Sequence, residues 1–370
     1  MKKTLIALAV LGAAAGVAHA QSNVTIYGIV DTGFIKKSGQ DVEMGENVNN
    51  RLGFRGVEDL GGGMKATFEL ERRFNLNNGT LKEDDKDWDG AANVGLKGDA
   101  WGAVRLGRVN ELTTETIRKF DPFYQYGVGA MLEGSQRVVR ISNTVRYDSP
   151  NWSGFHFGAS YSLGDNMDSD SRDPNSDLSQ AKVAGSGADN DGYAIMLGYD
   201  NGPLALVGNW SRLADSNKSS VWNLGAAYRF GPAKVELVYQ QTKDKGWVLG
   251  ERSNWAGAEN ALLNDKANPY WDADNITEKQ WLLGLEWKLG PGRLNASAQW
   301  MEVEANGASS HISDKDIYKY AIGYTYDLSK RTAIYGMVAY TDYDDEEVAR
   351  IYGDTDDGTT GVQVGITHKF

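Results

Sequence analysis

The chain has 370 residues, with 38 Lys and Arg against 50 Asp and Glu, a formal net charge of −12, and no Cys. The lack of Cys excludes a disulfide framework, a thiolate metal site and a Cys nucleophile. The acidic charge argues against a nucleic-acid partner, since binding to a phosphate backbone needs a basic face.

The first twenty residues carry the features of a cleaved export signal. Lys2 and Lys3 precede a short apolar run over 4–17, and Ala18-His19-Ala20 matches a cleavage site. We therefore expect a signal peptide over 1–20 and a mature chain that begins at Gln21; a buried N-terminal helix fits this pattern less well. Beyond residue 20 no run of 18 or more apolar residues is present, so the sequence predicts no transmembrane helix.

From residue 24 onward, side-chain character alternates with a period of two, which is typical of β-strands. In 281–288, for example, Trp and Leu residues alternate with a mixed set that includes Glu286 and Lys288. Aromatic residues stand at the ends of such segments and aliphatic or small residues between them, as expected where strands cross a lipid bilayer. The pattern predicts 16 strands, at 24–34, 50–58, 64–74, 91–98, 102–108, 138–148, 154–163, 192–200, 204–213, 220–230, 233–242, 278–289, 293–303, 317–327, 332–342 and 360–370.

The connections between these strands alternate between short and long. Short reversals such as 201–203 and 290–292 contain Gly and Pro, whereas 109–137, 164–191 and 243–277 are long and polar. An even strand number with tight turns at one end and long loops at the other is typical of outer-membrane barrels. A soluble β-sandwich is the alternative, but it gives no reason for outward aromatic residues at both strand ends. We predict an all-β fold, a 16-stranded antiparallel transmembrane β-barrel over 21–370.

Several segments match a known family. They are VTIYGIVD at 24–31, RLGFRG at 51–56, EDLGGG at 58–63, VGLKG at 94–98, VRLGR at 104–108, NTVRYDSP at 143–150 and HKF at 368–370. As a set they resemble the general, non-specific trimeric porins of Gram-negative outer membranes, of the β-proteobacterial type. Two segments depart from that family: DGA stands at 89–91, where an Arg is usual, and DPFYQYG at 121–127 replaces its PEFGG segment.

The resemblance implies a function and a set of partners. It implies passive transport of ions and small hydrophilic solutes through a water-filled channel in the cell outer membrane, with the third loop (109–137) folded inward to narrow it. It also implies a homotrimer and a C-terminal Phe370 that the barrel-insertion machinery reads as an assembly signal. The expected partners are therefore outer-membrane lipid and lipopolysaccharide, that machinery, small solutes and ions, with no nucleic acid.

Alternation assigns a row of basic side chains to the channel interior. Inward positions on neighbouring strands carry Arg, which scattered charge would not do; the alternative is that each is a solvated barrel residue with no shared role. The predicted basic wall of the constriction is Arg51, Arg55, Arg73, Arg105, Arg140 and Arg146.

The third loop carries acids that could face this wall, and Gly residues that could bend it. Its candidate acids are Glu111, Glu115, Asp121 and Glu133, although Arg118, Lys119 and Arg137 lie on the same loop. A basic wall opposite an acidic loop would produce a transverse field that sets ion preference. Because the outer loops carry the acidic excess, we also expect a mild cation preference at low salt.

Other function classes are less well supported. Only His156, His311 and His368 remain after residue 20, and no nucleophile motif or metal spacing is visible, so we predict no enzyme, no cofactor and no metal centre. The alternative to a porin is a structural or adhesin-type barrel whose acidic loops 82–89, 165–177 and 342–357 bind divalent cations. The outward faces of strands one to five and sixteen lack Trp and Tyr, which predicts the subunit interface there.

Overall fold

The computed structural model describes residues 23–82, 86–132, 140–163, 191–212, 219–244, 273–307, 311–352, 354 and 356–370. The predicted signal peptide, Glu133 and the whole of the acidic segment 165–177 lie outside these ranges. Within them, no helix has the length and apolar character needed to cross a membrane.

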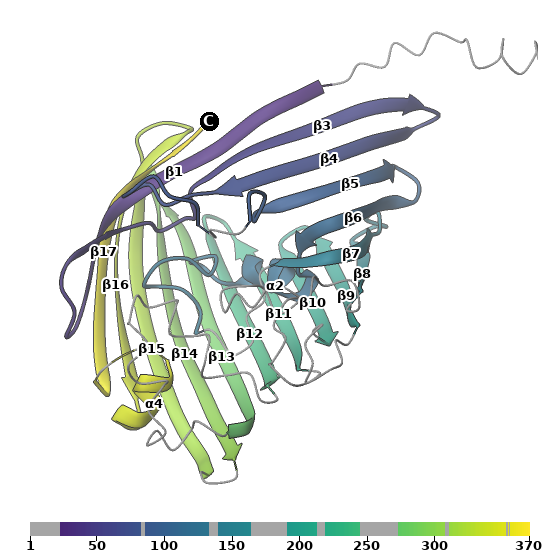
Figure 1. Cartoon of the computed structure of the whole chain (residues 1–370). Coiled ribbons are helices and arrows are strands. Elements are labelled where there is room, and N and C mark those ends of the chain that lie inside the picture. The colour runs from purple at the N-terminus through teal and green to yellow at the C-terminus, as the bar shows by residue number, and fades with distance from the viewer. Residues whose placement is uncertain are drawn as a thin grey trace, which may run out of the picture.

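Seventeen strands form one antiparallel sheet that closes on itself (Figure 1). Sixteen make the ring, which is the predicted number, and β2 (Glu43–Gly45) pairs only alongside β1. The ring strands are β1 (Asn23–Lys37), β3 (Arg51–Gly61), β4 (Met64–Arg73), β5 (Ala91–Gly98), β6 (Gly102–Asn110), β7 (Arg140–Asp148), β8 (Phe155–Ser162), β9 (Gly192–Asn201), β10 (Leu204–Arg212), β11 (Ser220–Phe230), β12 (Ala233–Asp244), β13 (Ala273–Leu289), β14 (Gly292–Gly307), β15 (His311–Asp327), β16 (Thr332–Tyr343) and β17 (Gly358–Lys369).

The ring is closed by pairing of the first and last strands. β1 and β17 run antiparallel from Ile29 opposite Lys369 to Lys37 opposite Gly361. One step beyond this ladder, Gly28 and Phe370 exchange two backbone hydrogen bonds of 3.1 Å each. The last residue of the chain therefore completes the closing seam, and no strand edge is left unpaired there.

The outer face is apolar and carries aromatic rings at both ends of the strands. Leu197 and Leu283 are 63% and 56% exposed, although they lie in the middle of strands β9 and β13. Tyr239 packs on Trp281 at the border of the apolar band nearer the long loops, and Phe155 packs on Tyr199 at the border nearer the short turns, each pair with ring centroids 4.7 Å apart. This is the outer surface that a lipid bilayer requires, with aromatic rings at its two interfaces.

Several strands are longer than the sequence predicted, and β13, β14 and β15 extend farthest, by several residues past the predicted ends at 278, 303 and 317. Inward residues at or beyond these ends, among them Ile276, Val303 and Ile317, are buried against Val348 and Ala349 of α4 (Glu346–Ile351). The prediction stopped where the outward apolar face ends, but the inward face continues because a helix of another loop covers it.

The third connection folds into the barrel, as predicted. Its described part, residues 111–132, is called the inner loop here; it contains α2 (Leu112–Ile117) and the 3₁₀ turn η1 (Arg118–Phe120). Figure 1 shows α2 within the ring of strands, where it packs on β8–β11. The barrel interior is therefore not polar throughout: inward apolar residues of β9–β13 are buried beneath the inner loop, namely Ala194, Met196, Val207, Ala227, Val238 and Leu282.

Candidate pore constriction

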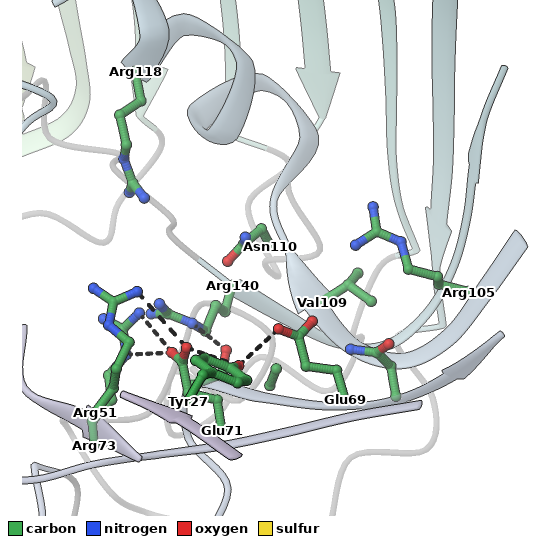
Figure 2. Close-up of a pocket in the computed structure, with 13 residues that line it drawn as sticks. Tyr27, Arg51, Glu69, Glu71, Arg73, Arg105, Val109, Asn110, Arg118 and Arg140 are labelled. Atoms are coloured by element: carbon green, nitrogen blue, oxygen red, sulfur yellow. Dashed lines mark hydrogen bonds and ion pairs between the residues drawn. The ribbon is translucent and has the colours of Figure 1, made fainter. Parts of the chain in front are cut away.

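Four of the six predicted arginines line one open cavity of about 230 Å³ inside the barrel. They are Arg51, Arg73, Arg105 and Arg140, from β3, β4, β6 and β7. Because β3–β7 are successive neighbours in the sheet and the four side chains point inward, they lie along one wall, with Arg51, Arg73 and Arg140 grouped together and Arg105 apart from them (Figure 2). The same cavity is lined by Tyr27, Glu69, Glu71, Asn93, Asn110 and Arg118, among others.

Arg51 and Arg73 lie directly opposite each other in the β3–β4 ladder, a placement that would be unfavourable for two like charges alone. Glu71 lies between them. Its carboxylate is 3.1 Å from Arg73 Nη2 and 3.7 Å from Arg51 Nη1, and it accepts a hydrogen bond of 3.2 Å from the Tyr27 hydroxyl. One carboxylate is thus shared by two guanidinium groups, and the three charges together leave a net positive charge.

A second pair of arginines, Arg105 and Arg146, faces across the β6–β7 ladder. Asp148 binds both, with N–O distances of 2.7 Å to Arg105 and 2.8 Å to Arg146. Arg146 also pairs with Glu115 of the inner loop and is only 3% exposed. Its charge is therefore matched by two carboxylates, and it does not line the cavity.

Arg55 and Arg140 differ in their surroundings. Arg55 is exposed and lies over the Tyr27 ring, 5.2 Å from its centroid, but it is not among the residues that line the cavity. Arg140 lines the cavity and donates from Nε to the carbonyl of Gly90. A Cβ at Gly90 would lie 2.5 Å from Glu71 Oε1, so the absence of a side chain there lets the wall pack closely.

The predicted acids of the third loop have three different environments. Glu111 is buried and caps α2, where its carboxylate accepts hydrogen bonds from Thr114 N and Thr113 Oγ1. Glu115 pairs with Arg146, as described above. Asp121 has no exposed surface, and Glu133 lies outside the described residues.

Asp121 organises the bend of the inner loop. Its carboxylate accepts backbone hydrogen bonds from Phe123 (2.9 Å), Gln125 (2.7 Å) and Met131 (2.9 Å). Burial raises the pKa of this carboxyl, and the three N–H groups partly offset that shift. The hydrogen bond from Phe123 N–H to the Asp121 side chain, two residues earlier, forms an Asx-type turn. The Asp-Pro pair at 121–122 is a sequence signal for such a turn.

The inner loop is bound to the barrel wall opposite the arginines. Thr116 Oγ1 hydrogen-bonds to Asn209 Oδ1 (2.8 Å), and further bonds join loop backbone groups to Asn295 (2.7 Å), Gln299 (2.6 Å), Lys319 (2.8 Å) and Gln363 (3.1 Å). Inward glycines make room for its side chains: a Cβ at Gly225 would lie 2.9 Å from Phe120, and one at Gly284 would lie 2.7 Å from Pro122. Sheet positions without side chains thus define where the loop lies.

Of the described residues of the loop, Arg118 lines the cavity and none of the acids does. Figure 2 shows Arg118 on the loop side with its side chain directed toward Arg51 and Arg73. Near it lies Tyr126, whose ring is 5.5 Å from the Arg118 guanidinium carbon and whose hydroxyl is 3.5 Å from Arg51 Nη2. Sequence reasoning did not select Tyr27 or Tyr126; alternation marks Tyr27 as inward, but no pattern marks Tyr126.

Among the residues that the structure describes, no group of three or more His, Asp or Glu side chains is arranged to hold a metal ion. His156, one of the three His residues named from the sequence, lies 3.5 Å from Asp200 and is flanked by the exposed Phe155 and Phe157. The alternative function, a structural or adhesin-type barrel whose acidic loops bind divalent cations, gains no support from the described parts of 82–89 and 342–357.

Comparison with known proteins agrees with this architecture. The model of the Gram-negative porin family matches residues 7–346. An outer membrane porin protein of Bordetella pertussis is 33% identical, and outer membrane porin protein 32 of Delftia acidovorans is 31% identical, each over the full length of both chains. A solved structure, the anion-selective porin from Comamonas acidovorans, aligns over 95% of this chain and all of its own with a TM-score of 0.71 and 26% identity. Family and fold indicate a channel, not an enzyme: the chain belongs to the Gram-negative porins, passive diffusion channels of the outer membrane.

Proposed function

We propose that the inner loop narrows this channel and that solutes pass between the loop and the arginine wall, where anions are favoured over cations. The observation that carries the proposal is the charge of the cavity. Five guanidinium groups and two carboxylates line it, and one of the five, Arg118, comes from the loop side. The field in the gap is then positive from both sides, and none of the described acids of the loop lines the cavity.

Charges in such a gap act strongly on a passing ion. Arg73 and Arg140 are less than a tenth exposed, so bulk water and salt screen them less than they screen surface charges. The acidic outer loops oppose this effect at the entrance, most strongly at low salt, where their field reaches farther. We therefore expect an anion preference that becomes larger as salt rises from low concentrations, until screening reaches the gap itself.

Reversal potentials in a KCl gradient across a planar bilayer test this proposal. The wild-type channel should favour chloride, and Arg51→Ser and Arg118→Ser should each shift the potential toward cations. Arg55→Ser is the matched control, because Arg55 is an inward arginine of the same strand as Arg51 that does not line the cavity. A cation-selective wild-type channel, or variants that all match the control, would contradict the proposal.

We also propose a homotrimer that assembles through β1, β3–β6 and β17. In these strands the exposed large apolar side chains are aliphatic, Met or Phe, such as Ile26, Val94 and Val364, and none of them is Trp or Tyr. Trp and Tyr on the outward faces of β9–β15 mark lipid contact, whereas a wall without them suits packing on protein. Closed rotational symmetry is the usual way in which such self-contacts are satisfied.

An Arg substitution on the proposed subunit interface and one on the lipid-facing side should have different effects. Ala66→Arg on β4 should dissociate the trimer, seen by unheated gel mobility and light scattering in detergent, whereas Ala298→Arg on β14 should impair insertion instead. Gly28 is unsuited to this test, because a Cβ there would lie 2.3 Å from the Phe370 ring and disturb ring closure. A trimer that survives Ala66→Arg would place the interface elsewhere.

The remaining proposals concern export, assembly and lipid. We propose that residues 1–20 are removed. N-terminal sequencing of protein isolated from outer membranes tests this, because the first residue found should be Gln21.

We propose that Phe370, whose backbone closes the ring and whose side chain is 45% exposed, is recognised by the insertion machinery. Outer-membrane lipid and lipopolysaccharide are the proposed neighbours of the aromatic face.

A further inference from the structure

The inner loop contains a strained turn beside the arginine cluster. Tyr124 and Gln125 have positive φ values of 55° and 60°, in the left-handed region that side chains other than Gly seldom adopt, and Gly127 follows with φ 64°. Such conformations cost of order 1 kcal/mol or more each and persist where surrounding contacts impose them. Here they turn the chain so that Tyr126, between them, enters the arginine cluster.

Three contacts hold Tyr126 in that position. Its backbone N–H donates to the Phe123 carbonyl (3.1 Å), its hydroxyl accepts from Arg51 (3.5 Å), and its ring lies beside Arg118. Arg118 is oriented in turn by Gln125, which accepts from its Nε at 3.3 Å. The strained turn therefore supplies both the phenol and the group that aligns the neighbouring guanidinium.

We propose that Tyr126 is a specificity-determining residue of the channel: its neutral hydroxyl leaves the arginine cluster fully positive, and its ionised form cancels one guanidinium charge in the gap. This inference rests on the proposed anion preference. The proton lost from the hydroxyl passes to bulk water, and the phenolate that remains is held by Arg51 and Arg118. The channel then favours anions less strongly as the pH rises.

The charges around the hydroxyl determine where ionisation occurs. Arg118 approaches from its own loop, Arg51 from β3 and Arg73 from β4. Beyond them lie two carboxylates: Glu71 is shared between Arg51 and Arg73, and Asp89 accepts a hydrogen bond from the backbone N–H of Arg73. Burial alone would raise the pKa of this phenol, but these three guanidinium groups outweigh burial and hold the pKa below its ordinary value. The phenol should therefore ionise at a lower pH than a tyrosine in water does.

Tyr126→Phe tests the inference with Tyr124→Phe as the matched control. Tyr124 lies in the same strained turn, but its ring is near Lys234, 5.9 Å from the ammonium, and not near the arginines. The permeability ratio of chloride to potassium is measured for all three channels from neutral to alkaline pH. In wild type and Tyr124→Phe the ratio should fall about threefold more than in Tyr126→Phe, the effect of roughly one unit charge on a small ion several ångströms away in salt solution.

Two readouts separate this inference from the proposed function. At neutral pH the wild-type and Tyr124→Phe channels should favour anions to the same degree; if wild type does not favour anions, the anion preference itself is wrong. A pH titration of phenolate absorbance, taken as wild type minus Tyr126→Phe in detergent, reports ionisation without any channel recording and should show one phenol that titrates below the ordinary tyrosine range. If the Tyr126→Phe channel has the same pH dependence as wild type, or the difference titration shows an ordinary tyrosine, the assignment of Tyr126 is overturned.

Discussion

Replacing Asp121 by Ala should release the inner loop without unfolding the barrel. The substitution removes the acceptor of three buried backbone N–H groups, those of Phe123, Gln125 and Met131, at 2.7–2.9 Å. A buried donor left without a partner costs about 1–3 kcal/mol, so three cost at least about 3 kcal/mol. Every 1.4 kcal/mol is about a factor of ten in an equilibrium constant, so the loop should open at least about 100 times more often.

Hydrogen exchange measured by mass spectrometry, on the full chain in detergent, follows this change directly. Peptides that cover the inner loop should exchange about 100-fold faster in Asp121→Ala, whereas those from β12 should be unchanged. Asp121→Asn keeps one acceptor oxygen and should lie between wild type and Ala. Asp87→Ala, which removes a carboxylate that is 72% exposed, should have no effect on the loop.

Unchanged protection of the inner loop in Asp121→Ala would refute the reasoning, because it would mean that the three N–H groups are satisfied without the carboxylate. Faster exchange over the whole barrel would refute it in another way, since it would show that the loop and the strands open as one unit. The hydrogen bonds from the inner loop to Asn295, Gln299 and Lys319 of the barrel wall would then contribute more to the loop's stability than Asp121 does.

Three other contacts can be tested by deletion or substitution. Deleting Phe370 removes both hydrogen bonds to Gly28, so the yield of folded, heat-modifiable barrel in outer membranes should fall while export across the inner membrane continues; a normal yield would exclude the residue as an assembly signal. Gly284→Ala should displace Pro122 and change single-channel conductance at a cost of about 1–3 kcal/mol to loop stability, whereas Gly336→Ala, with 3.7 Å of clearance, should behave as wild type. Glu115→Gln frees part of the Arg146 charge and should move the reversal potential toward chloride; no shift would mean that Asp148 alone neutralises Arg146.

Alternation was enough to predict the barrel and the facing of its side chains, because a period of two assigns every strand residue to one face. It placed Arg51, Arg73, Arg105 and Arg140 inside, where they line one cavity. It could not show which inward positions meet water. Leu282, for instance, is inward and fully buried because a loop far earlier in the chain covers it.

The acidic side of the predicted constriction was harder to infer, because the role of a loop acid depends on its partners and not on its charge. Glu111 caps a helix, Glu115 neutralises a strand arginine, and Asp121 binds backbone amides. Of these, the turn at Asp121 has a local sequence signal. The pairing of Glu115 with Arg146 depends on how the loop crosses the barrel, which no short pattern encodes.

The seating of the inner loop has a consequence for the order in which this protein folds. Its hydrogen-bonding partners include Asn295, Lys319 and Gln363, which follow their loop partners by 173 to 235 residues along the chain. Contacts of such high sequence separation form late, because the intervening chain must be ordered first. The barrel therefore has to close before the channel reaches its final width. A newly inserted channel should have a higher conductance than a mature one until the inner loop binds these residues of the barrel wall.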